Sequence, residues 1–229
     1  MRSVFINSND LNFNNELLSY SGDKFRHLTK VIRIRINERI ILFNESAETY
    51  LCKIEGIDKK SILFKKIKKE IFKPRYFLSI AIGIVKKEAM ERCLRNCMEL
   101  GISKIYLLKT AFSQDYFELK KRHETIIESG MEQSNFFFKP KVEFISNLED
   151  LDFEEYDNKI VLSTEENQKM DKIQRGHDLL LFGPEGGWSE EEIRFFKAKN
   201  LVFFQLETPI MRTPSAICAA VGSYLSLSR

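Results

Sequence analysis

The sequence predicts an α/β protein with two parts, a small β-rich part followed by a mainly parallel sheet with helices on both faces. From residue 75 onward, apolar runs of strand length alternate with amphipathic helical stretches, which is the pattern of a parallel sheet. Before residue 75, short strand-like runs follow one another at close spacing, as in a small barrel. The charged linker Lys73-Pro74-Arg75 separates the two patterns. We therefore expect one domain over residues 1–73 and a second over residues 74–229.

The first part is built mainly from short strands. Alternating or apolar runs predict strands over residues 3–6, 39–43, 48–55 and 61–68. A short helix is expected from Asp23 through Ile32, with Phe25, Leu28 and Val31 on one face. Four basic residues lie along this helix or just past it: Arg26, Lys30, Arg33 and Arg35.

The second part alternates between the two element types. Apolar runs predict strands over residues 75–84, 104–108, 141–145, 159–163, 179–182 and 201–206. Helical spacing predicts helices over residues 86–100, 118–134 and about 189–200, with a last helix from residue 213 to the C-terminus.

Composition is that of an ordinary soluble globular protein, with 43% hydrophobic and 30% charged residues. Met1 to Ser8 has no apolar signal region, and no apolar run is long enough for a membrane span. The four cysteines show no CxxC spacing and the three histidines are far apart, which disfavours a metal site. Cys93 and Cys97 are four residues apart on a predicted helix, so we expect core thiols of a cytoplasmic protein.

The net charge of +3 hides an asymmetry along the chain. Residues 1–75 hold 16 Lys and Arg against 9 Asp and Glu, whereas residues 76–229 hold 20 against 24. A basic first third suits nucleic-acid binding, because neutralising phosphates supplies most non-specific affinity. As an alternative, these lysines could belong to a solvated strand face and protect the sheet edge from aggregation, which would explain the same excess of basic residues.

The most informative stretch is LLLFGPEGGW, residues 179–188. A buried strand leads into a loop of three glycines and a proline, and Ser189 with Glu192 forms a capping box that opens a helix. Ligands bind at such carboxyl ends of strands in open α/β sheets. The loop lacks the Lys and Ser/Thr of a phosphate-binding loop and carries Glu185 instead, which favours a cation or a sugar hydroxyl. A plain strand-to-helix connection would also use these glycines.

A second loop of the same kind follows. The apolar run LVFFQL, residues 201–206, leads into ETPIMRTPSA, residues 207–216. Thr213 is a candidate N-cap of the last helix, and Pro214 suits its first turn. Both loops therefore leave the same end of the sheet.

The pair FGPEGGWSEEE and LETPIMRTPSA resembles the cofactor-binding signature of the SPOUT (trefoil-knot) RNA methyltransferases, and more narrowly the RsmE family. The resemblance extends over the whole chain in length and element order. It implies a PUA-like RNA-binding barrel followed by a trefoil-knotted methyltransferase domain. It further implies a homodimer that uses S-adenosylmethionine to methylate N3 of a uridine in small-subunit (16S) ribosomal RNA.

The same resemblance implies site residues. S-adenosylmethionine would be bound by three segments: Leu162, Ser163 and Thr164; Phe182, Gly183, Pro184, Glu185, Gly186 and Gly187; Leu206, Pro209, Met211, Arg212 and Ala216. Arg212 matches the motif arginine and is our candidate for stabilising charge on the uridine during transfer. The basic residues expected to bind RNA are Arg26, Lys30, Arg33, Arg35, Lys86 and Arg95.

The chain also departs from the family pattern. Pro214 and Ser215 stand where a Glu and a Thr are usual, Arg95-Asn96 replaces Gln-Lys, and an arginine expected near Ser113 is absent. Phe136 replaces another arginine, within a run of three phenylalanines that suits an RNA-stacking platform, a core or a dimer interface.

These departures leave alternatives to an active enzyme of the usual substrate. The chain could modify another RNA, or bind RNA as a homologue that has lost catalysis. A dinucleotide-dependent enzyme is disfavoured, because no GxGxxG stretch follows an early strand.

Overall fold

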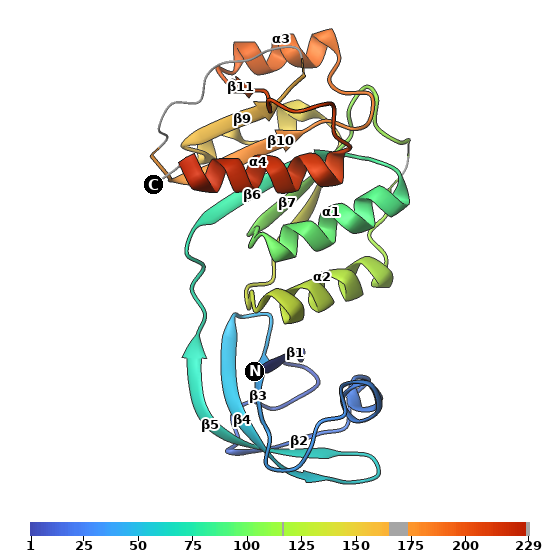
Figure 1. The fold of residues 1–229 in the computed structure, drawn as a ribbon, viewed down its shortest axis with the longest axis vertical. Coiled ribbons are helices and arrows are strands. Elements are labelled where there is room, and N and C mark those ends of the chain that lie inside the picture. The colour runs from blue at the N-terminus through green and yellow to red at the C-terminus, as the bar shows by residue number, and fades with distance from the viewer. Residues whose placement is uncertain (116, 165–173, 228–229) are drawn as a thin grey trace. The chain divides into compact units, whose positions relative to one another are not determined.

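The computed structural model describes residues 1–115, 117–164 and 174–227. Its contacts divide the chain into two compact units. Figure 1 shows the chain coloured by residue number, from blue at the N-terminus to red at the C-terminus. The first unit consists of Met1–Lys73 with Met131–Lys139, and the second of Pro74–Gly130 with Pro140–Arg229. Within the described residues, every helix is too short or too polar to cross a membrane.

The first unit is a five-stranded sheet in the order β1-β3-β4-β5-β2. Its strands are β1 (Arg2–Phe5), β2 (Leu17–Tyr20), β3 (Arg39–Phe43), β4 (Glu48–Ile57) and β5 (Ile62–Ile71). β1 runs parallel to β3 and the other pairs are antiparallel, with register shifts in the β4–β5 ladder. β2 was not predicted, because it is a short edge strand beside polar loop residues. The helix expected over residues 23–32 is wrong in extent: the structure has only a π-helical turn, η1 (His27–Ile32).

The segment from Met131 to Lys139 completes this first unit. The Glu132 carboxylate accepts hydrogen bonds from the Phe5 backbone N–H and from the Lys24 ammonium, both at 3.0 Å. Phe136 and Phe137 are buried, and the Phe137 ring lies 4.8 Å from the Phe43 ring, centroid to centroid. These phenylalanines are therefore core residues, and the RNA-stacking alternative for them is wrong.

The second unit is an all-parallel six-stranded sheet in the order β11-β9-β10-β6-β7-β8. Its strands are β6 (Phe77–Gly83), β7 (Lys104–Leu108), β8 (Lys141–Ile145), β9 (Asn158–Leu162), β10 (His177–Phe182) and β11 (Val202–Phe204). Its helices are α1 (Lys87–Glu99), α2 (Lys121–Ser134), α3 (Glu190–Ala198) and α4 (Thr213–Leu227), with 3₁₀ turns η2 (Leu148–Asp150) and η3 (Phe153–Glu155). The predicted parallel sheet is confirmed. The predicted and observed ends of its described elements differ by at most three residues.

Alternate residues of each strand point to opposite faces of this sheet, and apolar residues on both faces are buried under helices. Leu179 and Leu181 of β10 belong to one core cluster with Phe196 of α3. α1 and α4 contact each other over the other face (Figure 1). As predicted, Cys93 and Cys97 are buried free thiols of α1.

The apolar side of α4 lies inside the chain. Ile217 and Val221 are both fully buried. These two side chains therefore pack within the second unit.

Candidate functional site

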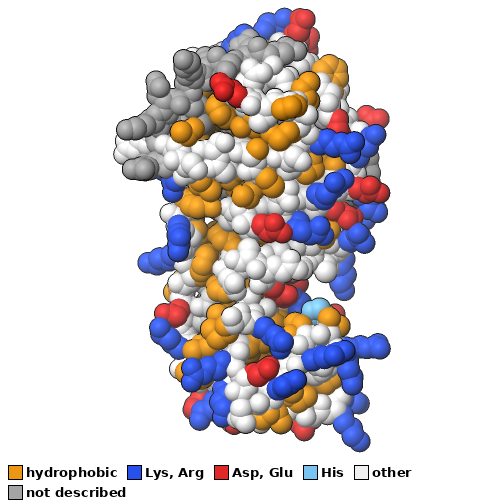
Figure 2. Space-filling view, in the orientation of Figure 1, with side chains coloured by type: hydrophobic (Ala, Val, Ile, Leu, Met, Phe, Trp, Pro, Cys, Tyr) orange, Lys and Arg blue, Asp and Glu red, His pale blue; other side chains and the backbone are white. Residues whose placement is uncertain are grey.

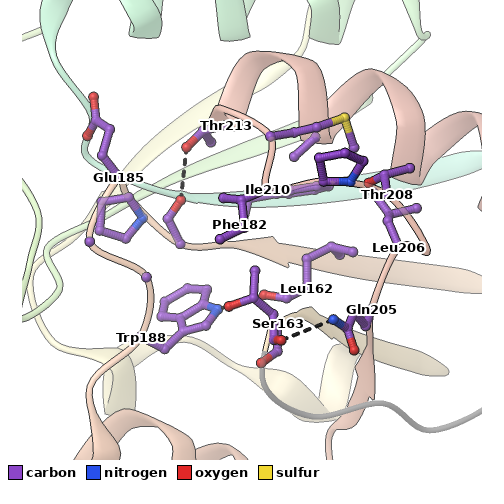
Figure 3. A pocket seen from close by; sticks show the side chains of 18 of the residues that line it. Leu162, Ser163, Phe182, Glu185, Trp188, Gln205, Leu206, Thr208, Ile210 and Thr213 are labelled. Atoms are coloured by element: carbon purple, nitrogen blue, oxygen red, sulfur yellow. Dashed lines mark hydrogen bonds between the residues drawn. The ribbon is translucent and has the colours of Figure 1, made fainter.

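A cavity of about 430 Å³ lies where β9, β10 and β11 end. Loops that follow the three neighbouring strands form its walls, and the first turn of α4 closes it (Figure 3). The carboxyl end of a parallel sheet is where ligands bind in open α/β folds. The cavity brings together every predicted cofactor-binding residue except Arg212: Leu162, Ser163, Thr164, Phe182, Gly183, Pro184, Glu185, Gly186, Gly187, Leu206, Pro209, Met211 and Ala216.

The glycine loop has the tight backbone that its sequence predicts. The Gly187 N–H donates to the Pro184 carbonyl at 3.0 Å, and Gly187 has a φ of 74°, a region that side chains disfavour. The capping box at the start of α3 is confirmed, since Ser189 and Glu192 exchange both hydrogen bonds. The loop is therefore held at both ends, by β10 and by the capped helix.

Trp188 is the most prominent wall residue that the sequence analysis missed. Its indole N–H donates to the Leu162 carbonyl at 3.0 Å, and its ring packs edge-on against Phe196. The contact joins the end of β9 to the loop after β10. The other missed wall residues are Ile193, Gln205, Thr208, Ile210 and Thr213. The signal for several of them was their place within the two motifs already singled out.

The first turn of α4 is fixed by hydrogen bonds to neighbouring elements. The Thr213 hydroxyl donates to the Gly183 carbonyl at 3.2 Å, so the glycine loop contacts the start of α4 (Figure 3). The Asn96 amide donates to the Pro214 carbonyl at 2.8 Å. The expected N-cap role of Thr213 is wrong, because Thr213 is the first residue of α4 and the Arg212 carbonyl accepts from the Ala216 N–H. Pro214 lies in the first turn, as predicted.

Arg212 lies between two wall residues but is not one of them. Its side chain is exposed, whereas Met211 and Thr213 line the cavity. Arg212 therefore stands at the rim of the cavity.

The cavity is nearly free of charge. Among the described wall residues, Glu185 carries the only charged side chain, and no Lys or Arg is present. Glu185 points away from Trp188 in Figure 3. One of its carboxylate oxygens lies 3.4 Å from the Lys86 backbone nitrogen, at the start of α1, where the helix dipole favours a negative charge. Such walls suit a ligand without phosphates and do not oppose a cationic one.

A buried polar network holds the far end of α4. The Asp178 carboxylate, 1% exposed, accepts from the Tyr224 hydroxyl at 2.6 Å and from the Asn158 amide at 2.5 Å. It also accepts from the Gly176 N–H at 3.0 Å. Burial and the neighbouring Asp178 carboxylate raise the pKa of Tyr224, so this hydroxyl remains a donor. Because Thr213 bonds to Gly183, α4 is tied near both ends of β10.

The predicted RNA-binding residues are all exposed but belong to different units. In the first unit, Arg26, Lys30, Arg33 and Arg35 lie on or beside η1. In the second, Lys86 precedes α1 and Arg95 lies on it. Figure 2 shows many Lys and Arg side chains on the visible face of the first unit.

One group of basic residues in the first unit was missed. Arg39, Lys53 and Lys65 are direct cross-strand neighbours on β3, β4 and β5. Like charges placed directly opposite one another destabilise a sheet. These three strands are the interior ones, so edge protection does not explain the row.

Within the described part of the chain, no three His, Cys, Asp or Glu side chains converge as a metal site would require.

Comparisons with known proteins agree with this architecture. A family profile described as "RNA methyltransferase domain" matches residues 73–225, and one described as "RNA methyltransferase PUA domain" matches residues 20–67. "Ribosomal RNA small subunit methyltransferase E 2" of Borreliella burgdorferi is 26% identical, over 99% of this chain and 98% of its own length. "Ribosomal RNA small subunit methyltransferase E" of Rickettsia conorii is 25% identical, over 96% and 93%.

The fold is also that of solved structures. A ribosomal RNA small subunit methyltransferase E from Neisseria gonorrhoeae, bound to S-adenosyl methionine, superposes with a TM-score of 0.83. That comparison covers 100% of this chain and 98% of the other, at 21% sequence identity. The trefoil knot expected from the sequence resemblance remains a prediction.

Proposed function

Because this chain belongs to the family of RNA methyltransferase domains, we propose that it transfers a methyl group from S-adenosylmethionine to N3 of a uridine in small-subunit ribosomal RNA. The observation that supports this most is that the two motif loops, after β10 and after β11, line the same cavity. The names of the curated relatives support the RNA class. The N3 position comes from the resemblance of the motifs to the RsmE family.

The cavity fits S-adenosylmethionine on its own features. When bound, this cofactor supplies an electrophilic methyl group on a positively charged sulfur and carries no phosphate. The described walls contain no cationic side chain that would repel it. Among the described residues, the backbone N–H groups of Gly186, Ile210 and Met211 have no hydrogen-bond partner, so they are available to a polar ligand. Residues from all three segments predicted to bind the cofactor would hold it.

We assign the charge-stabilising role to Arg212. Loss of the N3 proton leaves negative charge on the two flanking carbonyl oxygens of the uracil ring. A guanidinium beside the wall residue Met211 would stabilise that charge, and the exposure of Arg212 supports this role. The exposed side chain needs no rearrangement of the core to reach an RNA base.

The basic residues of the first unit would supply RNA affinity. The missed row of Arg39, Lys53 and Lys65 adds three cations on neighbouring strands, of which Lys53 is also paired with Glu55 at 3.1 Å. The boundary between the RNA-binding and methyltransferase parts would fall near Lys73. We further propose that the enzyme acts in the cytoplasm as a homodimer, as the family resemblance implies.

Cofactor binding can be measured at Trp188, the only tryptophan of the chain and a wall residue. Titration with S-adenosylmethionine, followed by fluorescence and by calorimetry, should give saturable binding for the wild type. Gly187→Ala should bind about tenfold more weakly, because alanine at this positive φ costs roughly 1–2 kcal/mol and moves the loop.

Gly222→Ala is the matched control. Neither glycine has an atom within 4 Å of an added methyl carbon, but Gly222 lies in α4 outside the cavity and has no positive φ. Absence of binding by the wild type, with RNA present, would refute the proposal.

Transfer itself is tested by mass spectrometry of small ribosomal subunits for N3-methyluridine. Arg212→Ala should bind the cofactor normally and transfer much more slowly. A wild type that binds the cofactor and RNA without transfer would favour the alternative of an RNA-binding homologue that has lost catalysis. The replacement of the usual Glu by Pro214 is the observation behind that alternative.

A further inference from the structure

Phe112 is an exposed aromatic residue placed against the glycine loop. It follows β7, and it is 52% exposed. A methyl carbon added at Gly186 would lie only 2.7 Å from the Phe112 Cβ, so the two residues are in close contact. Phe112 therefore flanks the loop that forms the cofactor cavity, although its ring is not part of the wall.

The turn that carries Phe112 is held in place. The Ala111 N–H donates to the Glu192 carboxylate at 2.8 Å, and Glu192 is the buried capping-box residue of α3. The Thr110 N–H donates to the Ser113 hydroxyl at 3.0 Å, and the Gln114 N–H donates to the Ile84 carbonyl at 2.9 Å. An apolar ring is thus presented to solvent on an ordered turn, where burial would ordinarily be favoured.

Basic side chains stand nearby. The Gln114–Ile84 bond joins the Phe112 turn to the connection before α1, which continues into Lys86 and Lys87, both exposed. The Lys86 backbone N–H contacts Glu185, the neighbour of Gly186. Phe112 and the backbone of the exposed Lys86 therefore contact consecutive residues of the glycine loop. Single-stranded nucleic acid is bound by this combination, with bases stacked on rings and phosphates near cations.

We propose that Phe112 stacks against an unpaired base of the RNA substrate at the rim of the cavity and so positions the strand for methyl transfer. This inference rests on the proposed function and deepens it, because it names the residue that recognises a nucleobase. Phe112 acts as a positioning residue, and the exposed Lys86 would contact an adjoining phosphate.

The test compares Phe112→Leu with Phe112→Tyr. Leucine keeps an apolar side chain without a π face, whereas tyrosine keeps the ring. Binding of a dye-labelled oligouridylate is measured by fluorescence anisotropy, and binding of an abasic oligomer of equal length serves as the phosphate-only control. Phe112→Leu should weaken oligouridylate binding about tenfold, in line with the loss of one stacked base. Phe112→Tyr should remain within twofold of the wild type, and the abasic oligomer should not distinguish the three proteins.

The same variants separate this inference from the proposed function. S-adenosylmethionine binding, read at Trp188, should be unchanged in Phe112→Leu, while kcat/KM on small ribosomal subunits falls with oligouridylate affinity. A wild type that binds no cofactor would refute the methyltransferase proposal and leave the stacking result standing. Equal oligouridylate binding by wild type and Phe112→Leu would overturn the stacking. So would a shift of Phe112→Leu from dimer to monomer in light scattering, because a second copy would then be what covers the ring.

Discussion

Tyr224→Phe should destabilise the second unit through the buried network that anchors α4. The variant removes one hydroxyl, whose 2.6 Å bond to the Asp178 carboxylate lies in a site where both residues are 1% exposed. A hydrogen bond to a charged group contributes about 1.5–3 kcal/mol, so we expect a loss of that size in the free energy of unfolding. Asp178→Ala should cost more, about 3–5 kcal/mol, because it leaves the Tyr224 hydroxyl buried without its acceptor and also removes the bonds from the Asn158 amide and the Gly176 N–H.

Urea denaturation followed by Trp188 fluorescence measures this effect, since Trp188 belongs to the same unit. A loss of about 2 kcal/mol should lower the midpoint by about 1 M. Tyr76→Phe is the matched control, because it removes a bond of the same length to the neutral Leu100 carbonyl and should cost about 1 kcal/mol. The reasoning fails if Tyr224→Phe costs no more than Tyr76→Phe. It also fails if the double variant with Asp178→Ala shows no coupling between the two sites.

Three further predictions concern other parts of the chain. Hydrogen bonds led by that from the Lys69 ammonium lower the pKa of Glu48 to about 2. The wild type should therefore lose stability as the pH falls from about 4.5 to 2, and Glu48→Gln should lose less stability over that window in acid denaturation. Glu70→Gln, which removes an exposed ion pair, is the control and should lose as much stability as the wild type. A thiol reagent should modify only the exposed Cys218 of the folded protein, because the other three thiols are buried and out of its reach, and reaction of all four without denaturant would contradict the structure. Glu192→Ala removes the hydrogen bonds that hold the start of α3 and the Phe112 turn. It should lower the free energy of unfolding by about 1–3 kcal/mol in urea denaturation and weaken oligouridylate binding as Phe112→Leu does. Unchanged oligouridylate affinity would show that Glu192 does not position Phe112.

Local sequence patterns determined most of the elements of the second unit. Continuous apolar runs and alternating helices are properties of neighbouring residues, so β7 and β8 begin and end where expected. The Ser189–Glu192 capping box was readable for the same reason, because its partners lie three residues apart. In the first unit, the short edge strand β2 was missed, since its pairing with β5 comes from residues far along the chain.

The fate of the phenylalanine run shows where local patterns stop. Nothing near Phe136 and Phe137 in the sequence reveals that residues 131–139 pack with the first unit. Their partners Phe43 and Phe72 lie more than sixty residues away, and only packing brings the rings within about 5–6 Å.

The sequence by itself determined the α/β class and the two motif loops, because these depend on glycine conformation, apolar periodicity and spacing along the chain. Most of the cavity wall was expected only from the resemblance of those motifs to a known family. Only the tertiary structure decided that Trp188 joins the glycine loop to the end of β9, that Arg212 stands at the rim, and that Phe112 is held against Gly186 by Glu192. Each of these depends on contacts between segments far apart in the chain. Such contacts form when the parallel strands bring their carboxyl ends together, and no local pattern records them.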